Sequence, residues 1–253
     1  MRAPEAAFDP AGLEAVGFDA VGFDAVGFDL DYTLWDQDAF ARSFFAAIAP
    51  EWGRRLGWGC GQVLGACHGA LERLTLAHPY LFDHILHRLG AWDPRLVAEL
   101  VRCYRDHRPA AEPYPGVPEV LRRLRAAGLR LFLVTDGHGP AQRHKVQALG
   151  LGPLFDQMVF TGDFAGNLHK PSPFPFQLAC GRLGLAPARC AYVGDNPACD
   201  VAGPRSLGML TIGVATGPFA RLAGPQAPAP HLRVDALEAV TDLLVCDRVG
   251  GTP

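Results

Sequence analysis

Short apolar runs alternate with helix-like segments through the second half of the chain, and this alternation constrains the fold more than any other feature. From Pro113 onward the pattern predicts helices over residues 118–127, 140–149, 173–184 and 198–207, and strands over 129–134, 157–160, 190–193 and 210–214. A last helix is expected over 234–245, after a loop rich in Pro, Gly and Ala over 217–231. Strands that alternate with helices form parallel sheets with helices on both faces. The sequence therefore predicts an α/β fold with a doubly wound parallel sheet.

Two aspartates follow an apolar run near the N-terminus. Residues 25–28 indicate a buried parallel strand, and Asp29 and Asp31 come directly after it. This is the edge where open α/β sheets place their chemistry. The sequence Val-Gly-Phe-Asp occurs three times, ending at Asp19, Asp24 and Asp29, but only the third copy is followed by a second carboxylate two residues on. Residues 1–22 are therefore expected to form a peripheral extension.

The segment between Leu34 and Pro113 has a different pattern. Apolar residues spaced by three and four predict helices over 40–52, 63–76, 81–89 and 96–104, punctuated by Pro50, Pro79 and Pro94. This change of pattern predicts two domains. Residues 1–34 and 114–253 would form the α/β core, and residues 35–113 an inserted all-helical domain.

Composition narrows the function classes. The chain has 253 residues, 49% of them hydrophobic, and a net charge of -3, which leaves no basic excess for a general nucleic-acid binder. No apolar run approaches the roughly 18 residues that span a bilayer. Seven cysteines without a Cys-x-x-Cys pair, and no signal-like N-terminus, favour a reducing cytoplasm. We expect a soluble monomer or homodimer without nucleic-acid or membrane partners.

Polar residues follow the other predicted strands. Thr135 ends the strand over 129–134, and Lys170 lies in the loop after the strand over 157–160. Asp195 and Asp200 lie after the strand over 190–193, in Gly-Asp-Asn-Pro-Ala-Cys-Asp. Because the carboxyl ends of parallel strands meet at one edge, these side chains should converge on Asp29.

These residue types suit phosphoryl transfer. A carboxylate such as Asp29 can attack phosphorus, which splits one displacement into two easier ones. The leaving alkoxide needs a proton, which Asp31 can donate and later take back from water. The phosphoryl oxygens need donors and cations, such as the hydroxyl of Thr135 and the ammonium of Lys170. Hard carboxylate oxygens select Mg²⁺, for which Asp29 and Asp195 are the candidate side-chain ligands.

Taken in order, four segments resemble the four motifs of the haloacid dehalogenase superfamily. They are Asp-x-Asp-x-Thr at 29–33, Thr135, Lys170, and Gly-Asp-x4-Asp at 194–200, and the match covers residues 25 to about 245. The resemblance implies a Rossmann-like core with a C1-type helical cap. It also implies a Mg²⁺-dependent phosphatase that acts on a small phosphorylated metabolite through an aspartyl-phosphate. By the same resemblance, the Asp31 carbonyl is a third metal ligand, and Asp200 orients Lys170 or a metal-bound water, with Asn196 behind the metal ligands.

Several neighbouring residues are open to two interpretations. Trp35 and His138 could line the substrate pocket, but hinge packing or simple surface placement is an equal alternative. Asp136 and Gly137 follow Thr135 and are candidate phosphate-binding residues, although relatives often carry Asn where this chain has Asp136. One group invites a zinc interpretation but lacks four ligands at a recognised spacing, so we expect its members inside the insert. The group is Cys60, Cys67, His68, His84 and His87.

Other activities use similar residues. A phosphohexose mutase would use the same set, so the sequence leaves it open. A 2-haloacid dehalogenase is metal-free and lacks an acid at the position of Asp31, which argues against it. A phosphonate hydrolase would need a lysine in the cap, whereas the two lysines, Lys145 and Lys170, both fall in the predicted core. The particular phosphomonoester is not predicted.

Overall fold

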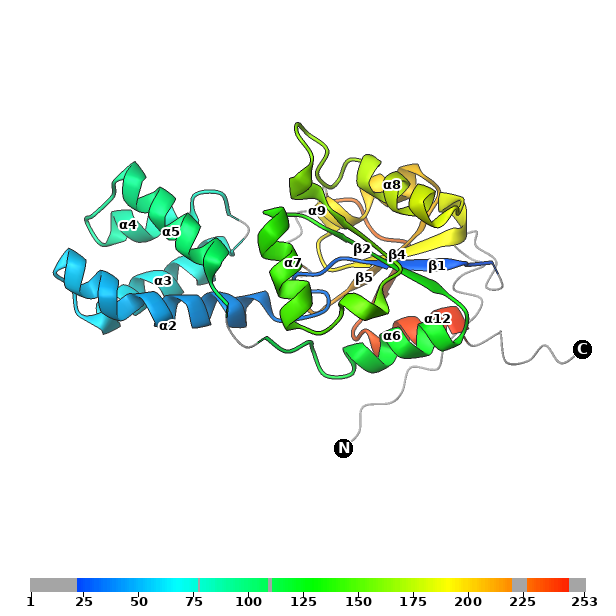
Figure 1. The fold of residues 1–253 in the computed structure, drawn as a ribbon, viewed down its shortest axis with the longest axis horizontal. Helices are drawn as coiled ribbons and strands as arrows, with labels where there is room; N and C mark the ends of the chain where they lie inside the picture. The colour runs from blue at the N-terminus through cyan, green and yellow to red at the C-terminus, as the bar shows by residue number, and fades with distance from the viewer. Residues whose placement is uncertain (1–21, 77, 109–110, 220–226, 246–253) are drawn as a thin grey trace, which may run out of the picture. The chain divides into compact units, whose positions relative to one another are not determined.

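The computed structural model describes residues 22–76, 78–108, 111–219 and 227–245. The chain divides into two compact units, each described here by itself: unit 1 comprises residues 1–35 and 113–253, and unit 2 comprises residues 36–112 (Figure 1). Most of the extension expected over 1–22 lies outside the described residues, as does the middle of the loop expected over 217–231.

Unit 1 is built on a six-stranded parallel sheet with the order β3-β2-β1-β4-β5-β6. Its strands are β1 (Ala25–Phe28), β2 (Arg130–Thr135), β3 (Gln157–Phe160), β4 (Cys190–Gly194), β5 (Leu210–Val214) and β6 (Leu232–Val234). Its helices are α6 (Val117–Ala126), α7 (Gly139–Ala148), α8 (Phe174–Leu183), α9 (Pro197–Asp200), α10 (Ala202–Ser206) and α12 (Glu238–Val245). The described part of unit 1 also has short 3-10 turns: η1 (Gly152–Leu154), η2 (Thr161–Asp163) and η3 (Pro187–Arg189). The predicted α/β fold with a doubly wound sheet is confirmed.

The first strand lies in the middle of the sheet because it can be buried on both faces. All four residues of β1 are buried, and they pair with β2 on one side and β4 on the other. Gly27 is required there, since a Cβ would collide with the rings of Phe132 and Tyr192 on the two neighbouring strands. The strand order reverses at β1, and this switch point is where open α/β sheets leave a crevice for ligands.

Helices cover both faces of the sheet. Helices α6 and α12 pack side by side on one face, and α8 packs against β2 and β3 on the other (Figure 1). The core on the α8 side is entirely apolar apart from the tyrosine hydroxyl. It is formed by Ala25, Phe132, Val134, Val159, Phe176, Ala179, Cys180, Cys190, Tyr192 and Met209.

Three details differ from the sequence expectations. The helix expected over 198–207 is divided into α9 and α10 at Val201, because Pro204 has no N–H to donate to the carbonyl of Asp200. The helix expected over 234–245 begins only at Glu238, and Val234 instead ends β6. Pro50 does not punctuate the insert, since it lies inside a continuous helix.

In its described residues, unit 2 contains four helices: α2 (Gln37–Leu56), α3 (Cys60–Leu74), α4 (Leu81–Arg88) and α5 (Pro94–Asp106). Asp36 caps α2 by accepting a hydrogen bond from the Ala39 N–H, and Gly57 ends the helix in the left-handed conformation. Asp93 caps α5 in the same way. Within the described residues, none of the helices of either unit is both long and apolar enough to cross a membrane.

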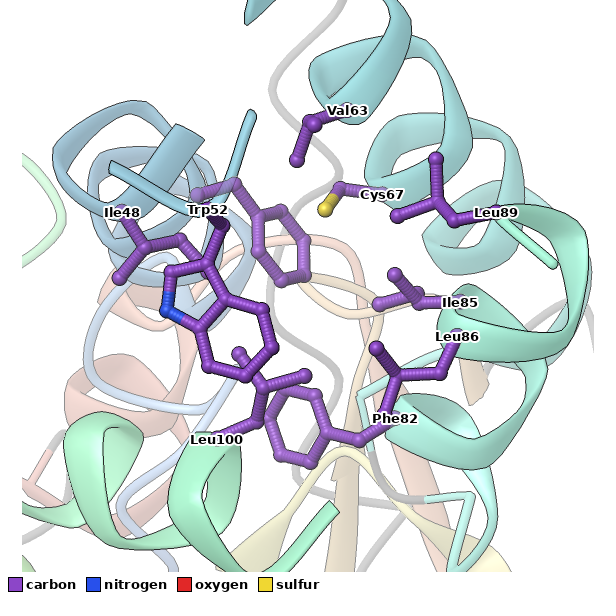
Figure 2. A pocket seen from close by; sticks show the side chains of 10 residues that line it. Ile48, Trp52, Val63, Cys67, Phe82, Ile85, Leu86, Leu89 and Leu100 are labelled. Atoms are coloured by element: carbon purple, nitrogen blue, oxygen red, sulfur yellow. The ribbon is translucent and has the colours of Figure 1, made fainter. Parts of the chain in front are cut away.

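The apolar core of unit 2 contains a small cavity of about 10 Å³ (Figure 2). Side chains of all four helices line it and expose no polar atom to it, so a water molecule there would find no polar partner. The lining side chains are Phe45, Ile48, Trp52, Val63, Cys67, Phe82, Ile85, Leu86, Leu89 and Leu100. We infer that the cavity is a dry packing defect and not a ligand site.

Candidate active site

The predicted catalytic residues converge at the carboxyl edge of the sheet in unit 1. Asp29 follows β1, Thr135 ends β2, and Asp195 follows β4, so the three lie on adjacent strands. The backbone N–H of Asp29 donates to the carbonyl of Val193 at 2.9 Å, which extends the sheet pairing to the first site residue.

Lys170 joins two of the carboxylates. Its ammonium donates to Asp29 Oδ1 at 2.5 Å and to Asp200 Oδ1 at 2.7 Å, and its Nζ lies 5.9 Å from the centre of the Tyr192 ring. The side chains of all three members of this ion-pair chain are at least nine-tenths buried. A buried ion pair of this kind is expensive to desolvate, so its presence indicates a functional constraint more than a stabilising one.

Three carboxylates lie close enough to share a cation. One oxygen from each of Asp29, Asp195 and Asp200 lies within 4.8 Å of the others, and among the described residues this is the one group of its kind. Thr33, the third residue of the first motif, connects them: its Oγ1 lies 3.4 Å from both Asp29 Oδ2 and Asp195 Oδ1 and accepts from the Asp195 N–H at 3.1 Å.

Crowding of negative charge perturbs the ionisation of this group. Burial raises the pKa of Asp195 from 3.8 to about 9, and the charges of Asp29 and Asp200 add to the effect. Burial also raises the pKa of Asp29 to about 7, although Lys170 opposes the shift. The pKa of Lys170 stays well above its usual value, because Asp200 and Asp29 outweigh the burial that would lower it. One ammonium thus does not neutralise three buried carboxylates.

The same residues fit a magnesium ion. Asp195 Oδ2 is buried without a hydrogen-bond partner among the described residues, and its carboxylate is one of the three in the cluster. Gly217 keeps the space beside this oxygen open, since a Cβ there would collide with it and would lie 2.7 Å from the Cβ of Tyr32. A hard divalent cation is the partner that such oxygens prefer. Asp29 and Asp195 would hold the ion, with Asp200 beside them.

The carboxylate of Asp31 has a different set of partners. Lys145 Nζ donates to both of its oxygens at 2.9 Å, Gln142 Nε2 donates to Oδ2 at 2.9 Å, and Trp35 Nε1 donates to Oδ1 at 2.9 Å. Gln142 Nε2 also donates to Thr135 Oγ1 at 2.7 Å. Both α7 residues are buried, which separates this contact from an ordinary surface salt bridge.

Asp136 turns toward the loop that carries Lys170. Its Oδ1 accepts from the Thr161 hydroxyl at 2.6 Å and from the Lys170 N–H at 3.2 Å. The Thr161 hydroxyl also lies 3.0 Å from His169 Nδ1. The carboxylate of Asp136 therefore holds the lysine loop in place. Gly137 follows with a φ of 113°, a conformation that favours glycine.

The remaining predicted residues, Trp35, His138 and Asn196, differ in their surroundings. Trp35 is buried and hydrogen-bonded to Asp31, whereas His138 is exposed at the start of α7. Asn196 caps α9 by accepting from the Ala198 N–H at 3.1 Å, and its own backbone N–H donates to Asp200 Oδ2 at 3.0 Å. Asn196 thereby fixes the carboxylate that holds Lys170.

Sequence reasoning included Thr33 in the first motif without giving it a role, and it missed Gln142, Lys145 and Thr161 as site residues. The scarcity of lysine was a signal for Lys145 as much as for Lys170, since the chain contains only these two. Gln142 and Lys145 are three residues apart on a predicted helix, so they share a face. Which face meets Asp31 depends on tertiary packing, which the helical spacing does not reveal.

Comparisons with known proteins agree with this geometry. The model of the haloacid dehalogenase-like hydrolase family matches residues 23–208. A phosphoserine phosphatase from Thermus thermophilus is 32% identical over 195 residues, which is 75% of this chain and 76% of that protein. A glyceraldehyde 3-phosphate phosphatase from Methanopyrus kandleri is 37% identical over 144 residues, or 56% of this chain, and the match spans 61% of its length.

A solved structure agrees with the fold. The putative HAD-hydrolase YfnB from Bacillus subtilis, bound to magnesium, superposes with a TM-score of 0.65 at 19% identity, over 88% of this chain and 99% of that one. At this identity the likeness establishes the fold alone. The family match over residues 23–208, which is most of the chain, shows that this chain belongs to the haloacid dehalogenase-like hydrolases.

Proposed function

We propose that this protein is a Mg²⁺-dependent phosphatase that hydrolyses a small phosphomonoester through an aspartyl-phosphate on Asp29. The observation that carries the proposal is the buried group of Asp29, Asp195 and Asp200, in which Asp195 Oδ2 has no hydrogen-bond partner within the described part of the chain. Bound there, Mg²⁺ would neutralise the carboxylates and draw charge from the phosphoryl oxygens. The phosphatases named above support phosphoryl chemistry for this chain.

The chain's own residues divide the reaction between them. An oxygen of Asp29 forms a bond to phosphorus as the bond to the leaving oxygen breaks, and Asp31 gives that oxygen a proton. Lys170 and the Thr135 hydroxyl hold the phosphoryl oxygens. Water then attacks phosphorus and gives a proton to Asp31. This attack breaks the bond between phosphorus and the Asp29 oxygen, so that phosphate is released and the Asp29 carboxylate is restored.

Unit 2 is proposed as a C1-type cap. It is inserted between the first motif, which ends at Thr33, and the second, at Thr135. A cap of this type would exclude bulk water and select the leaving group.

We also propose a reducing, cytoplasmic location, because the cysteines within the described residues are free thiols. We further propose that the protein is a monomer or a homodimer. Sedimentation analysis can decide between these two states.

The test is phosphate release from a panel of phosphomonoesters that includes glyceraldehyde 3-phosphate, phosphoserine and p-nitrophenyl phosphate. Turnover should require Mg²⁺, disappear in excess chelator, and disappear in Asp29→Asn, because an amide is not a competent nucleophile. The matched control is Asp106→Asn, which removes an exposed carboxylate at the end of α5. Full turnover in chelator, or halide release from a 2-haloacid, would overturn the proposal.

A further inference from the structure

The carboxylate of Asp31 is held by more donors than a side chain in a solvent-exposed loop would acquire. Lys145 contacts both oxygens at 2.9 Å, and Gln142 and Trp35 each contact one at 2.9 Å. The Lys145 ammonium also lies 5.5 Å from the centre of the Trp35 ring. Two χ angles set the direction of an aspartate side chain, and this set of contacts fixes both.

The buried ion pair between Lys145 and Asp31 is not expected to stabilise the fold. Its side chain is 7% exposed and that of Asp31 is 17% exposed, so both charges are largely removed from water. Replacing a buried ion pair with apolar side chains is often neutral or stabilising. Helix α7 would therefore pack as well with Met or Leu at position 145. The presence of an ion pair there needs an explanation other than stability.

Gln142 adds a second connection. One Nε2 group donates to Asp31 Oδ2 and to Thr135 Oγ1, at 2.9 and 2.7 Å. An amide nitrogen carries two protons, so it can serve both acceptors at once. Because Thr135 Oγ1 accepts here, its own proton must point elsewhere. In this structure the hydroxyl lies 3.5 Å from the Asp136 carbonyl oxygen, a long contact that a phosphoryl oxygen could replace.

We infer that Lys145 and Gln142 are positioning residues that fix the side chain of Asp31 and tie it to the hydroxyl of Thr135. The inference rests on the proposed phosphatase activity, in which Asp31 serves the leaving oxygen and Thr135 the phosphoryl group. The helix α7 thus sets the distance between the proton-transfer group and the phosphate-binding hydroxyl. Neither α7 residue touches the reacting atoms in this role.

The expected signature is a selective loss. A misplaced proton donor slows the departure of a poor leaving group far more than that of an aryl oxide, which needs little protonation. We expect Lys145→Met to lower kcat for phosphoserine by about 10- to 100-fold and for p-nitrophenyl phosphate by less than about threefold, with KM nearly unchanged. Gln142→Leu should show the same bias. The control is Gln147→Met, an exposed position on the same helix.

Two further variants exclude a merely structural effect. In an Asp31→Asn background, Lys145→Met should cause no further loss, because the group that it positions is gone. Equal losses for both substrates, no loss for either, or a full additional loss in the Asp31→Asn background would each overturn the inference.

The contact itself can be tested without turnover. Because the chain has only two lysines, protein carrying lysine labelled at the ε-carbon should show two side-chain NMR signals, and Lys145→Met identifies one of them. Asp31→Asn should shift the Lys145 signal, whereas Gln147→Met should leave it in place. If wild-type protein hydrolyses none of the phosphomonoesters while this shift is seen, the proposed function fails. The catalytic role of Lys145 and Gln142 then fails with it. If wild-type protein is active and the signal does not respond to Asp31→Asn, the positioning inference alone fails.

Discussion

Three buried carboxylates share one ammonium around Asp29, and this imbalance is the central physical fact at the scale of single residues. For stability alone, a buried site with balanced charges would be better, with fewer carboxylates or with a further cationic side chain. Excess negative charge of this kind attracts a divalent cation, and under the proposed function that cation would allow an anionic phosphate to approach.

The first prediction concerns the stability of metal-free protein. Burial raises the pKa of Asp195 from 3.8 to about 9, so the folded state keeps a proton that the unfolded state releases near pH 4. Between about pH 4 and pH 9 the folded state therefore binds more protons, and the free energy of unfolding falls as pH rises through this window. Asp195→Asn should stabilise metal-free protein at pH 8 by roughly 1 kcal/mol or more, since one pKa unit corresponds to about 1.4 kcal/mol.

Thermal unfolding in chelator between pH 5 and pH 9 measures this effect. Tm of wild-type protein should fall with pH more steeply than Tm of Asp195→Asn, and Mg²⁺ should raise Tm of wild-type protein only. Some slope should persist in the variant, because the pKa of Asp29 is also raised, to about 7. Equal slopes in the two proteins would show that Asp195 is ionised without metal.

The second prediction concerns Gly217. A Cβ at this position would collide with the Asp195 carboxylate, so Gly217→Ala should displace the ligand and weaken Mg²⁺ binding by about tenfold or more, the range seen when groups that support metal ligands are altered. Gly181→Ala is the control, because a Cβ at that position in α8 meets nothing within 4 Å. Titration calorimetry with Mg²⁺ compares the two, and unchanged affinity in Gly217→Ala would place the ion elsewhere.

At the scale of elements, the sequence predicted what depends on local pattern. The strands that carry Asp29, Thr135 and Asp195 were each placed correctly, since continuous apolar runs bounded by polar turns leave few alternatives. The strand β6 was not predicted: its three residues, Leu-Arg-Val, are too few to form a recognisable pattern, and it exists because β5 offers a free edge to pair with. The division of α9 from α10 was predictable, because Pro204 was visible in the sequence.

The contacts of α7 show where prediction from sequence stops. Helical spacing places Gln142 and Lys145 on one face, but the 111 and 114 residues that separate them from Asp31 leave their partner undetermined. Likewise, Asp136 was a candidate for binding phosphate, and only the fold shows that its carboxylate accepts from Thr161 and the Lys170 backbone.

The third prediction concerns the helical core of unit 2. Leu100 is 2% exposed and lines the cavity of about 10 Å³ (Figure 2), so Leu100→Ala would enlarge an existing void. The expected loss of stability is about 2–5 kcal/mol, from lost burial and the larger cavity together. Leu96→Ala, at a partly exposed position of the same helix, should cost less. Denaturant unfolding measures the free energy of unfolding of both variants. Equal losses in the two variants would mean that the cavity left by Leu100→Ala collapses.

At the scale of the whole molecule, two segments connect unit 1 to unit 2, and the unit 1 ends of these segments are hydrogen-bonded to each other. Trp35 and Pro113 form an isolated antiparallel bridge, and the Tyr114 N–H donates to the Leu34 carbonyl at 2.9 Å. Unit 2 is therefore inserted at a point where the two ends of unit 1 are already adjacent. Such points tolerate insertion and removal, because the remaining chain need not stretch to close the gap.

The fourth prediction follows from this adjacency. Replacing residues 36–112 with a short Gly/Ser linker between Trp35 and Pro113 should leave unit 1 folded, since its sheet, its apolar core and the Asp29 cluster lie entirely outside the deleted segment. The linker must only cover a distance that the Trp35–Pro113 bridge already makes short. Circular dichroism and cooperative thermal unfolding would show whether the core survives, and Gly/Ser linkers of two lengths control for strain at the junction.

Activity of this capless variant then tests the role of unit 2. If unit 2 is a cap that selects the leaving group, its removal should impair phosphoserine and glyceraldehyde 3-phosphate far more than p-nitrophenyl phosphate, whose aryl oxide leaves without help. The variant should also release phosphate from a wider range of esters, because no cap side chains exclude them. A folded capless protein that keeps the wild-type ranking of substrates would show that specificity resides in unit 1, and the cap assignment would be wrong.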